Sequence, residues 1–128
     1  MRQVIYESVA TDASAAAMAP AILRGARPFN GLNGVTGLLC AARGRFLQVL
    51  EGPTDSVGLA LERIRNDPRH HEIEILSDRP VETRTFSDWS MAYRDSGHPA
   101  DLLDERMRVL VADIPQEIGD RFKSFVSP

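Results

Sequence analysis

Cysteine is nearly absent from this sequence, and that shortage excludes two kinds of protein. Cys40 is the single cysteine, so no internal disulfide can form, and the cytoplasm is the predicted compartment. Three scattered histidines beside that one cysteine do not predict a metal site. Neither a disulfide-linked secreted protein nor a metalloprotein is expected.

Long apolar runs and excess positive charge are also missing. No run of about 18 apolar residues occurs, so no transmembrane helix is predicted. Residues 1–6 lack the long apolar core of a signal peptide. The net charge of −3 argues against nucleic acid and against an anionic membrane as partners. What remains is one domain of 128 residues, 43% hydrophobic and 26% charged, which is long enough for a substantial core.

The pattern along the chain predicts alternating strands and helices. The expected strands are Gln3–Val9, Val35–Ala41, Arg45–Gly52, Glu72–Ser77 and Asp88–Arg94. The expected helices are Asp12–Arg27, with Ile22 and Leu23 as its core contacts, and a second one capped by Thr54 or Asp55, with Val57, Leu61 and Ile64 on one stripe. Residues 28–34 are expected to form a loop, and Ala42–Gly44 a hairpin turn. Because an interior proline loses a hydrogen bond, the first helix is expected to begin at Pro20 or to be kinked there.

The order of these elements predicts an α+β fold, a ferredoxin-like β-α-β-β-α-β plait with an added fifth strand. Two further amphipathic segments follow, predicted as C-terminal helices. Their apolar residues at helical spacing are Leu102, Leu103, Met107, Leu110 and Val111, then Ile118, Phe122 and Phe125. Two interpretations stay open for these helices: they cover the bare face of the sheet, or they form a surface for a partner or a dimer.

Gln48 is the least expected residue of the third predicted strand. It shares a face with Phe46 and Leu50 by the period of two, so an amide is placed between two large apolar side chains. An unpartnered buried amide costs about 1–3 kcal/mol, which predicts a definite hydrogen-bond partner. That partner is either the backbone or water, or a group with a function.

Four motifs in this order resemble the BLUF domain, the blue-light sensor that uses FAD. They are Tyr6 in a first strand, Asn30 six positions before Thr36-Gly37-Leu38-Leu39, Phe46-Leu47-Gln48-Val49-Leu50-Glu51-Gly52, and Phe86-Ser87-Asp88-Trp89-Ser90-Met91. The run Asp67-Pro68-Arg69-His70 is similar to the family as well. The resemblance extends from about Gln3 to Tyr93. It implies a flavin-binding photosensory domain over residues 1–94, with residues 95–128 as a helical extension that packs on the sheet or mediates assembly.

The resemblance also implies roles for individual residues. Asn30 would bond the C4 carbonyl and N3 edge of the flavin, and Gln48 would bridge the flavin N5 and C4 carbonyl to the hydroxyl of Tyr6. Tyr6 would be the electron donor. FAD is the implied cofactor, with FMN as a possible substitute.

Three basic residues in and just after the second helix would lie near the ribityl chain and phosphates. These are Arg63, Arg69 and His70, because phosphates need cations and donors. Arg63 could equally be an ordinary solvated arginine at a helix end. Asp67 would bond a ribityl hydroxyl or cap the turn.

The sequence departs from the family pattern in three places. Phe29 stands before Asn30 where relatives often carry a polar residue, and it is expected to pack against the flavin ring. The first helix is unusually rich in alanine and contains Pro20. No effector domain is expected after the terminal helices, so the signal is expected to leave through an unknown protein partner or a change in assembly of a homo-oligomer.

The function implied by the resemblance is light sensing, not enzymatic catalysis. After Tyr6 donates an electron and a proton, Gln48 would rotate or tautomerise and donate to the flavin C4 carbonyl, which shifts absorption to the red. Trp89 and Met91 on the last strand would pass the change to the terminal helices. Two alternatives are a flavin-binding or redox module insensitive to light, and a small phosphatase on the same plait.

Overall fold

The computed structural model describes residues 1–11, 15–86, 91–94 and 102–126. Five strands form one sheet in the order β4-β1-β3-β2-β5, and β5 runs parallel to β2 while the other neighbours are antiparallel. The strands are β1 (Arg2–Ala10), β2 (Thr36–Ala42), β3 (Arg45–Gly52), β4 (His70–Pro80) and β5 (Ala92–Arg94). The predicted plait with a fifth strand is confirmed.

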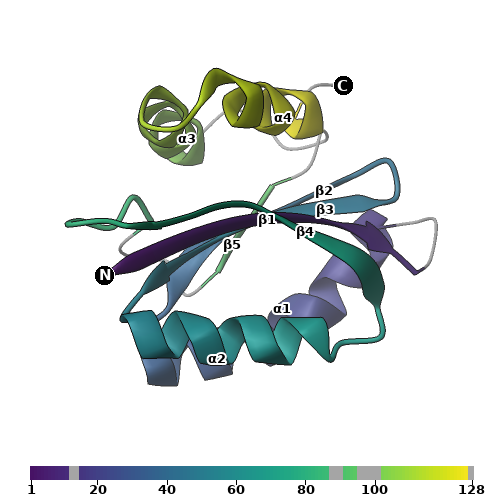
Figure 1. The fold of residues 1–128 in the computed structure, drawn as a ribbon. Helices are drawn as coiled ribbons and strands as arrows, with labels where there is room; N and C mark the ends of the chain where they lie inside the picture. The colour runs from purple at the N-terminus through teal and green to yellow at the C-terminus, as the bar shows by residue number, and fades with distance from the viewer. Residues whose placement is uncertain (12–14, 87–90, 95–101, 127–128) are drawn as a thin grey trace.

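Four helices cover the two faces of this sheet (Figure 1). They are α1 (Ala15–Asn33) and α2 (Thr54–Arg65) on one face, and α3 (Leu102–Ala112) and α4 (Gln116–Val126) on the other. The sheet therefore lies between two helical layers, each with its own apolar cluster.

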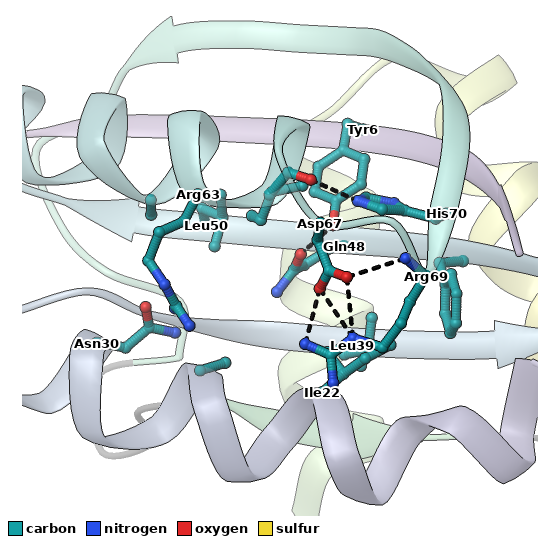
Figure 2. Close-up of a pocket in the computed structure, with 14 residues that line it drawn as sticks. Tyr6, Ile22, Asn30, Leu39, Gln48, Leu50, Arg63, Asp67, Arg69 and His70 are labelled. Carbon is teal, nitrogen blue, oxygen red and sulfur yellow. Dashed lines mark hydrogen bonds and ion pairs between the residues drawn. The ribbon is translucent and has the colours of Figure 1, made fainter. Parts of the chain in front are cut away.

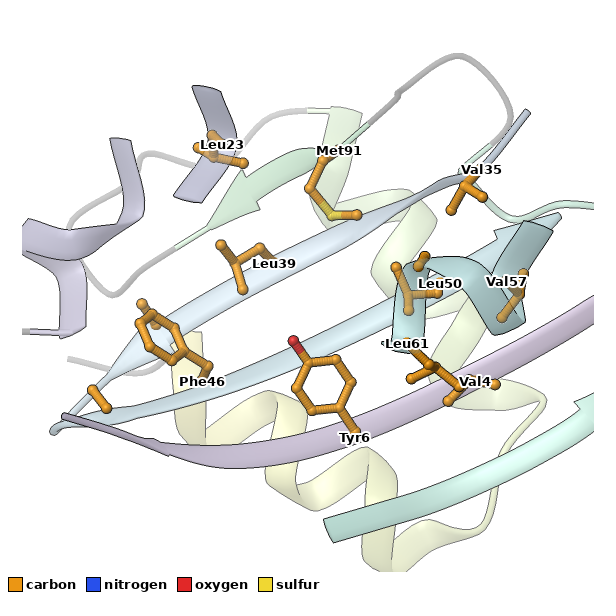
Figure 3. Close-up of a cluster of buried hydrophobic side chains, with 13 residues drawn as sticks. Val4, Tyr6, Leu23, Val35, Leu39, Phe46, Leu50, Val57, Leu61 and Met91 are labelled. Carbon is orange, nitrogen blue, oxygen red and sulfur yellow. The ribbon is translucent and has the colours of Figure 1, made fainter. Parts of the chain in front are cut away.

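The period of two along the strands divides the side chains between the two clusters. Tyr6, Leu39 and Leu50 pack in the cluster beneath α1 and α2, shown in Figure 3. Their strand neighbours Ile5 and Leu38 belong to the cluster beneath α3 and α4. The single cysteine, Cys40, is buried in this second cluster.

The two C-terminal helices bury their apolar stripes on the sheet. Met107, Leu110, Ile118, Phe122 and Phe125 are all buried there. This packing matches the first of the two interpretations of these helices, the one in which they cover the bare face.

An ion pair ties α4 to the sheet as well. Arg121 Nη1 donates to Glu7 Oε2 at 2.7 Å, and Arg45 Nη2 approaches the same oxygen at 3.3 Å. Because the side chain of Glu7 is only 9% exposed, this carboxylate needs those cations. The contact links α4 to β1.

The predicted loop over residues 28–34 is wrong, because α1 continues through it to Asn33. Both Pro20 and Pro28 lie inside the helix, and the helix is already formed at Ala15, before Pro20. Tertiary packing of the helix offsets the hydrogen bonds that the two prolines cannot donate, and Asn33 Nδ2 donates to the carbonyl of Phe29 at 2.8 Å in the last turn. Gly34, with φ +68°, then ends the helix in the left-handed conformation that glycine adopts without strain.

Three other boundaries differ from the sequence prediction. The capping residue of α2 is Pro53 rather than Thr54 or Asp55, and no side chain caps it. β4 is longer than predicted because it pairs with β1 along its whole length. Residues 88–90 of the last predicted strand lie outside the described residues, and β5 covers Ala92–Arg94.

The predicted hairpin between β2 and β3 is confirmed. Its two turn residues, Arg43 and Gly44, have φ of 51° and 73°. Positive φ at both central positions is what a tight turn between right-twisted strands requires. The turn fixes the register that places Gln48 of β3 opposite Leu39 of β2.

Candidate functional site

A pocket opens between α1 and α2 against strands β1, β2 and β3. All seven residues predicted to bind a cofactor line it, from four separate parts of the chain (Figure 2). They are Tyr6, Asn30, Gln48, Arg63, Asp67, Arg69 and His70. The other lining residues are mostly apolar, among them Ile22, Leu39 and Leu50. The structure thus gathers residues that are up to 64 positions apart into one site.

Tyr6 and Gln48 form a buried hydrogen-bonded pair on adjacent strands. They face each other in the register of β1 and β3, and each is only 3% exposed. The Tyr6 hydroxyl donates to Gln48 Oε1. Burial raises the pKa of the Tyr6 phenol far above its ordinary value, with a smaller contribution from the charge of Asp67. The phenol therefore keeps its proton at any working pH, and it holds the oxygen end of the amide toward itself.

The nitrogen end of the Gln48 amide faces a much weaker partner. Its Nε2 donates to the sulfur of Met91 at 3.3 Å, and a thioether is a poor acceptor. Among the described residues, Gln48 Nε2 therefore has neither a backbone carbonyl nor another strong acceptor as its partner. One end of the amide is held firmly and the other loosely.

Arg27 holds Met91 from the opposite side. Its Nε donates to the backbone carbonyl of Met91 at 3.1 Å. The contact joins α1 to the residue just before β5. The sequence does not single out Arg27, because a lone arginine on a helix carries no spacing signal.

Asn30 reaches the pocket from the last turns of α1 rather than from a loop. It is 3% exposed, and its backbone carbonyl accepts from the amide of Val35 at 2.9 Å. That bond closes the helix end onto the start of β2. The unexpected extension of α1 is thus what places Asn30 on the pocket wall.

Asp67 and Arg69 form a closed ion pair at one side of the pocket. Arg69 donates to the Asp67 carboxylate through its backbone amide, Nε and Nη2, at 2.8 to 3.0 Å. Burial alone would raise the pKa of Asp67, but the hydrogen bonds and charge of Arg69, with the charge of His70, lower it below its ordinary value. Asp67 organises this turn and orients Arg69.

The imidazole of His70 is engaged at both nitrogens. Nε2 lies 2.7 Å from the carbonyl of Ile64, which can only accept, so this nitrogen carries a hydrogen. Nδ1 lies 2.8 Å from Ser8 Oγ. The ring is tilted against Tyr6 with centroids 6.1 Å apart. His70 therefore forms a wall beside the phenol, with both nitrogens satisfied within the protein.

Arg63 extends from α2 across the pocket toward α1 (Figure 2). Its Nη2 donates to the carbonyl of Gly25 at 3.3 Å, and its guanidinium carbon lies 4.7 Å from the centre of the Phe29 ring. Arg63 thus bridges the two helices. An ordinary solvated arginine, the alternative interpretation, would not make these contacts with α1. Phe29, predicted to pack against a ligand ring, contacts Arg63.

Trp89 lies outside the described residues. Among the residues that the structure describes, no group of histidine, cysteine and carboxylate side chains could hold a metal ion. Among the described residues, no helix is long and apolar enough to cross a membrane.

The pocket's chemistry fits a flat heteroaromatic ring with a polar rim and an anionic tail. Apolar walls from Ile22, Leu39 and Leu50 enclose a slot that the buried side chain of Gln48 also lines. Two arginines, Arg63 and Arg69, stand at its borders. An amide can match ring carbonyls and nitrogens, and guanidinium groups match phosphates.

A family model described as sensors of blue-light using FAD, BLUF, matches residues 1–92. Among curated proteins, the photoactivated adenylate cyclase subunit beta of Euglena gracilis is 37% identical over 87 residues, covering 67% of this chain and 10% of that protein. The photoactivated adenylate cyclase subunit beta-like protein ST-, also from Euglena gracilis, is 33% identical over 123 residues, covering 95% of this chain and 13% of that protein. The chain spans about a tenth of the length of the curated relatives it matches.

Solved structures give the same answer for the fold. The dark-state structure of BlrB, a BLUF protein, is 30% identical with a TM-score of 0.70, over 88% of this chain and 79% of that one. The ground state of BlsA is 26% identical with a TM-score of 0.71, over 96% and 85% of the two chains. A structure of Klebsiella pneumoniae BlrP1 with FMN and cyclic diGMP is 27% identical with a TM-score of 0.72, over 84% of this chain and 29% of that one.

Proposed function

Because this chain belongs to the BLUF family, the blue-light sensors that use FAD, we propose that its Tyr6–Gln48 pair converts absorbed light into a change of hydrogen bonding. The observation that carries the proposal is the buried bond from the Tyr6 hydroxyl to Gln48 Oε1 inside the pocket. FAD is the cofactor of the family, and the FMN-bound BlrP1 structure is consistent with FMN as a substitute.

Residues of this chain can be assigned to parts of the cofactor by their chemistry. Asn30 and Gln48 present amides to the polar rim of the ring, between the apolar walls of the slot. Arg63 and Arg69 offer guanidinium donors to carbonyl or phosphate oxygens. Asp67 fixes Arg69, and His70 shapes the wall beside Tyr6. When bound, FAD supplies the absorption of blue light and an acceptor for one electron.

Tyr6 supplies the electron and the proton. A phenol is oxidisable, and Gln48 Oε1 stands where it can receive the phenolic proton. Gln48 would then rotate or tautomerise as the electron and the proton return to Tyr6, so the phenol is restored. Among the described residues, the sulfur of Met91 is what holds the nitrogen end, so turning the amide sacrifices little there. In the new orientation the phenol oxygen can accept from the nitrogen. The amide of Gln48 then presents a different arrangement of hydrogen-bond donor and acceptor to the pocket, and no covalent product forms.

The purified protein is expected to be yellow and to release its flavin intact when denatured. No described side chain that lines the pocket is a cysteine, and the two other residue types present that can attach a flavin are engaged within the protein: Tyr6 through its hydroxyl and His70 through both nitrogens. Acid or heat denaturation followed by filtration should put all the flavin absorbance in the filtrate, as FAD with or without FMN. Flavin that stays with the denatured chain would contradict noncovalent binding.

Met91 and Ala92 connect the two cores of the molecule, which suggests a route for the signal. Met91 packs in the cluster beneath α1 and α2, whereas its neighbour Ala92 packs against the cluster beneath α3 and α4. A Gln48 amide that no longer donates to the Met91 sulfur alters the start of β5, and β5 pairs with β2 beneath those helices.

Hydrogen exchange in darkness and under blue light should therefore differ over residues 102–126. Met91→Leu removes the sulfur acceptor at similar volume and should weaken this difference while leaving the colour change largely intact. Trp89→Ala is expected to act in the same direction. Equal protection of 102–126 in dark and light would place the output elsewhere, on the 42–44 hairpin or the edge of α2.

The signal is proposed to pass to a protein partner or through a change in assembly of a homo-oligomer in the cytoplasm. Photoactivated adenylate cyclase is the name of several relatives, so light regulation of an effector is a use to which such domains are put. BLUF domains are sensors, and we assign no catalytic residue to this chain.

A further inference from the structure

The guanidinium of Arg63 rests on a surface of α1 made by two residues that have no assigned role. Phe29 places its ring beneath the guanidinium, 4.7 Å from ring centre to Cζ, within the distance of a cation–π contact. The carbonyl of Gly25 accepts from Nη2 at 3.3 Å. Because Phe29 follows Gly25 by four positions on one helix, both face the same side.

Gly25 leaves room that any other residue would fill. A Cβ built on Gly25 would lie 3.2 Å from Arg63 Nη2, closer than an ordinary van der Waals contact. Glycine is a poor residue for a helix interior, and Gly25 lies in the middle of α1. The missing side chain at this point is therefore accounted for by the approach of Arg63.

We propose that Phe29 and Gly25 are positioning residues that seat Arg63, so that its guanidinium bridges α2 to α1 and retains the flavin in the pocket. The proposal rests on the proposed function and deepens it. An arginine has five N–H donors. In this seat, formed by Phe29 and Gly25, one donor bonds the Gly25 carbonyl and one face of the guanidinium lies on the Phe29 ring. The remaining donors can reach carbonyl or phosphate oxygens of the flavin. Phe29 then acts on the flavin through Arg63 rather than by packing against the ring.

A double-mutant cycle on flavin release separates these two ways of acting. Phe29→Leu keeps an apolar side chain but deletes the π face, and should speed the release of FAD about 2- to 30-fold, the range of a cation–π contact. In an Arg63→Gln background the same substitution should have almost no effect. Phe29→Tyr, which keeps the ring, should release FAD at the wild-type rate, and Gly25→Ala should speed release in the Arg63 background alone.

Leu32→Ala is the matched control, because Leu32 lies on the same helix and is 89% exposed. It should leave release unchanged. If Phe29→Leu speeds release equally with and without Arg63, Phe29 contacts the flavin directly and the proposal is overturned. If Phe29→Leu has no effect in either background, the proposal is overturned as well.

A measurement on the flavin-free protein tests the seat without any cofactor. The side-chain Nε–H proton of Arg63 should have a chemical shift upfield of the value for arginine in an unfolded chain, because the guanidinium lies over an aromatic ring. Phe29→Leu should remove that difference. Absence of an upfield shift in the wild-type protein would overturn the proposal. Failure of the wild-type protein to bind FAD would instead overturn the proposed function, and the resonance would still decide whether the seat exists.

Discussion

Gln48→Leu is expected to abolish the light-induced red shift completely while the protein stays yellow. Leucine fills a similar volume but has neither donor nor acceptor, so no change of hydrogen bonding can follow excitation. In the proposed mechanism, a new hydrogen bond from the amide to a ring carbonyl lowers the excitation energy. Gln48 is only one of several residues on the pocket wall, and the apolar walls and Asn30 remain to hold the ring. The measurement is the absorption spectrum before and after blue light.

Gln116→Leu provides the matched control for this substitution. It makes the same chemical change at an exposed position on α4 and should leave the shift intact. A normal red shift in Gln48→Leu would show that the amide is not the element that changes.

Tyr6→Phe should lose the shift for a different reason. We propose the phenol as the electron and proton donor, and phenylalanine keeps the packing of the ring while deleting the hydroxyl that bonds Gln48. Tyr93→Phe is the control, since Tyr93 is the other tyrosine of the chain and only partly buried. Because burial raises the pKa of Tyr6 far above its ordinary range, the size of the shift should be independent of pH between about 6 and 9.

Gly37→Ala is expected to have the largest effect on stability. A Cβ at Gly37 would lie 1.9 Å from the backbone carbonyl oxygen of Val49 and 2.9 Å from its carbon, on the strand next to β2. Backbone atoms cannot rotate out of the way, so β2 and β3 must separate at the register that supports Gln48. A loss of more than about 4 kcal/mol in the free energy of unfolding is expected, which is exceptional for a single substitution.

Urea unfolding of the flavin-free protein measures this, and Gly58→Ala is the control. A Cβ at Gly58 meets only Arg2 Nη1 at 3.6 Å, an ordinary contact, and Gly58 lies inside α2. Alanine there should stabilise the protein by about 0.5–1 kcal/mol. A Gly37→Ala protein within about 1 kcal/mol of the wild type would contradict the packing of β2 on β3.

The sheet could be predicted from the sequence because its strands carry a strong period and a clear turn. Arg45–Gly52 was predicted with the bounds that the structure shows, since Arg43-Gly44 supplies the positive φ angles of a tight hairpin. The buried stripes of the two C-terminal helices were predictable for the same reason, a clean helical spacing.

The first helix could not be predicted correctly from local rules. Pro28 and the Asn-Gly pairs after it indicate a loop, yet tertiary packing of Phe29 and Asn30 keeps residues 28–33 helical. The site followed from the family resemblance rather than from spacing, because its members come from β1, α1, β3 and the end of α2. Three contacts have no signature in the sequence: Arg27 on the carbonyl of Met91, Arg63 on Phe29, and His70 between Ser8 and Ile64.

The absorption spectrum of the purified wild-type protein, recorded in darkness and again during blue light, tests the central claim most directly. A bound flavin whose bands move to the red by several nanometres, and return in darkness without loss of pigment, is the result expected if Tyr6 and Gln48 rearrange reversibly. A yellow protein whose spectrum is unchanged by blue light would contradict the account, and would leave a flavin-binding module in which light has no part.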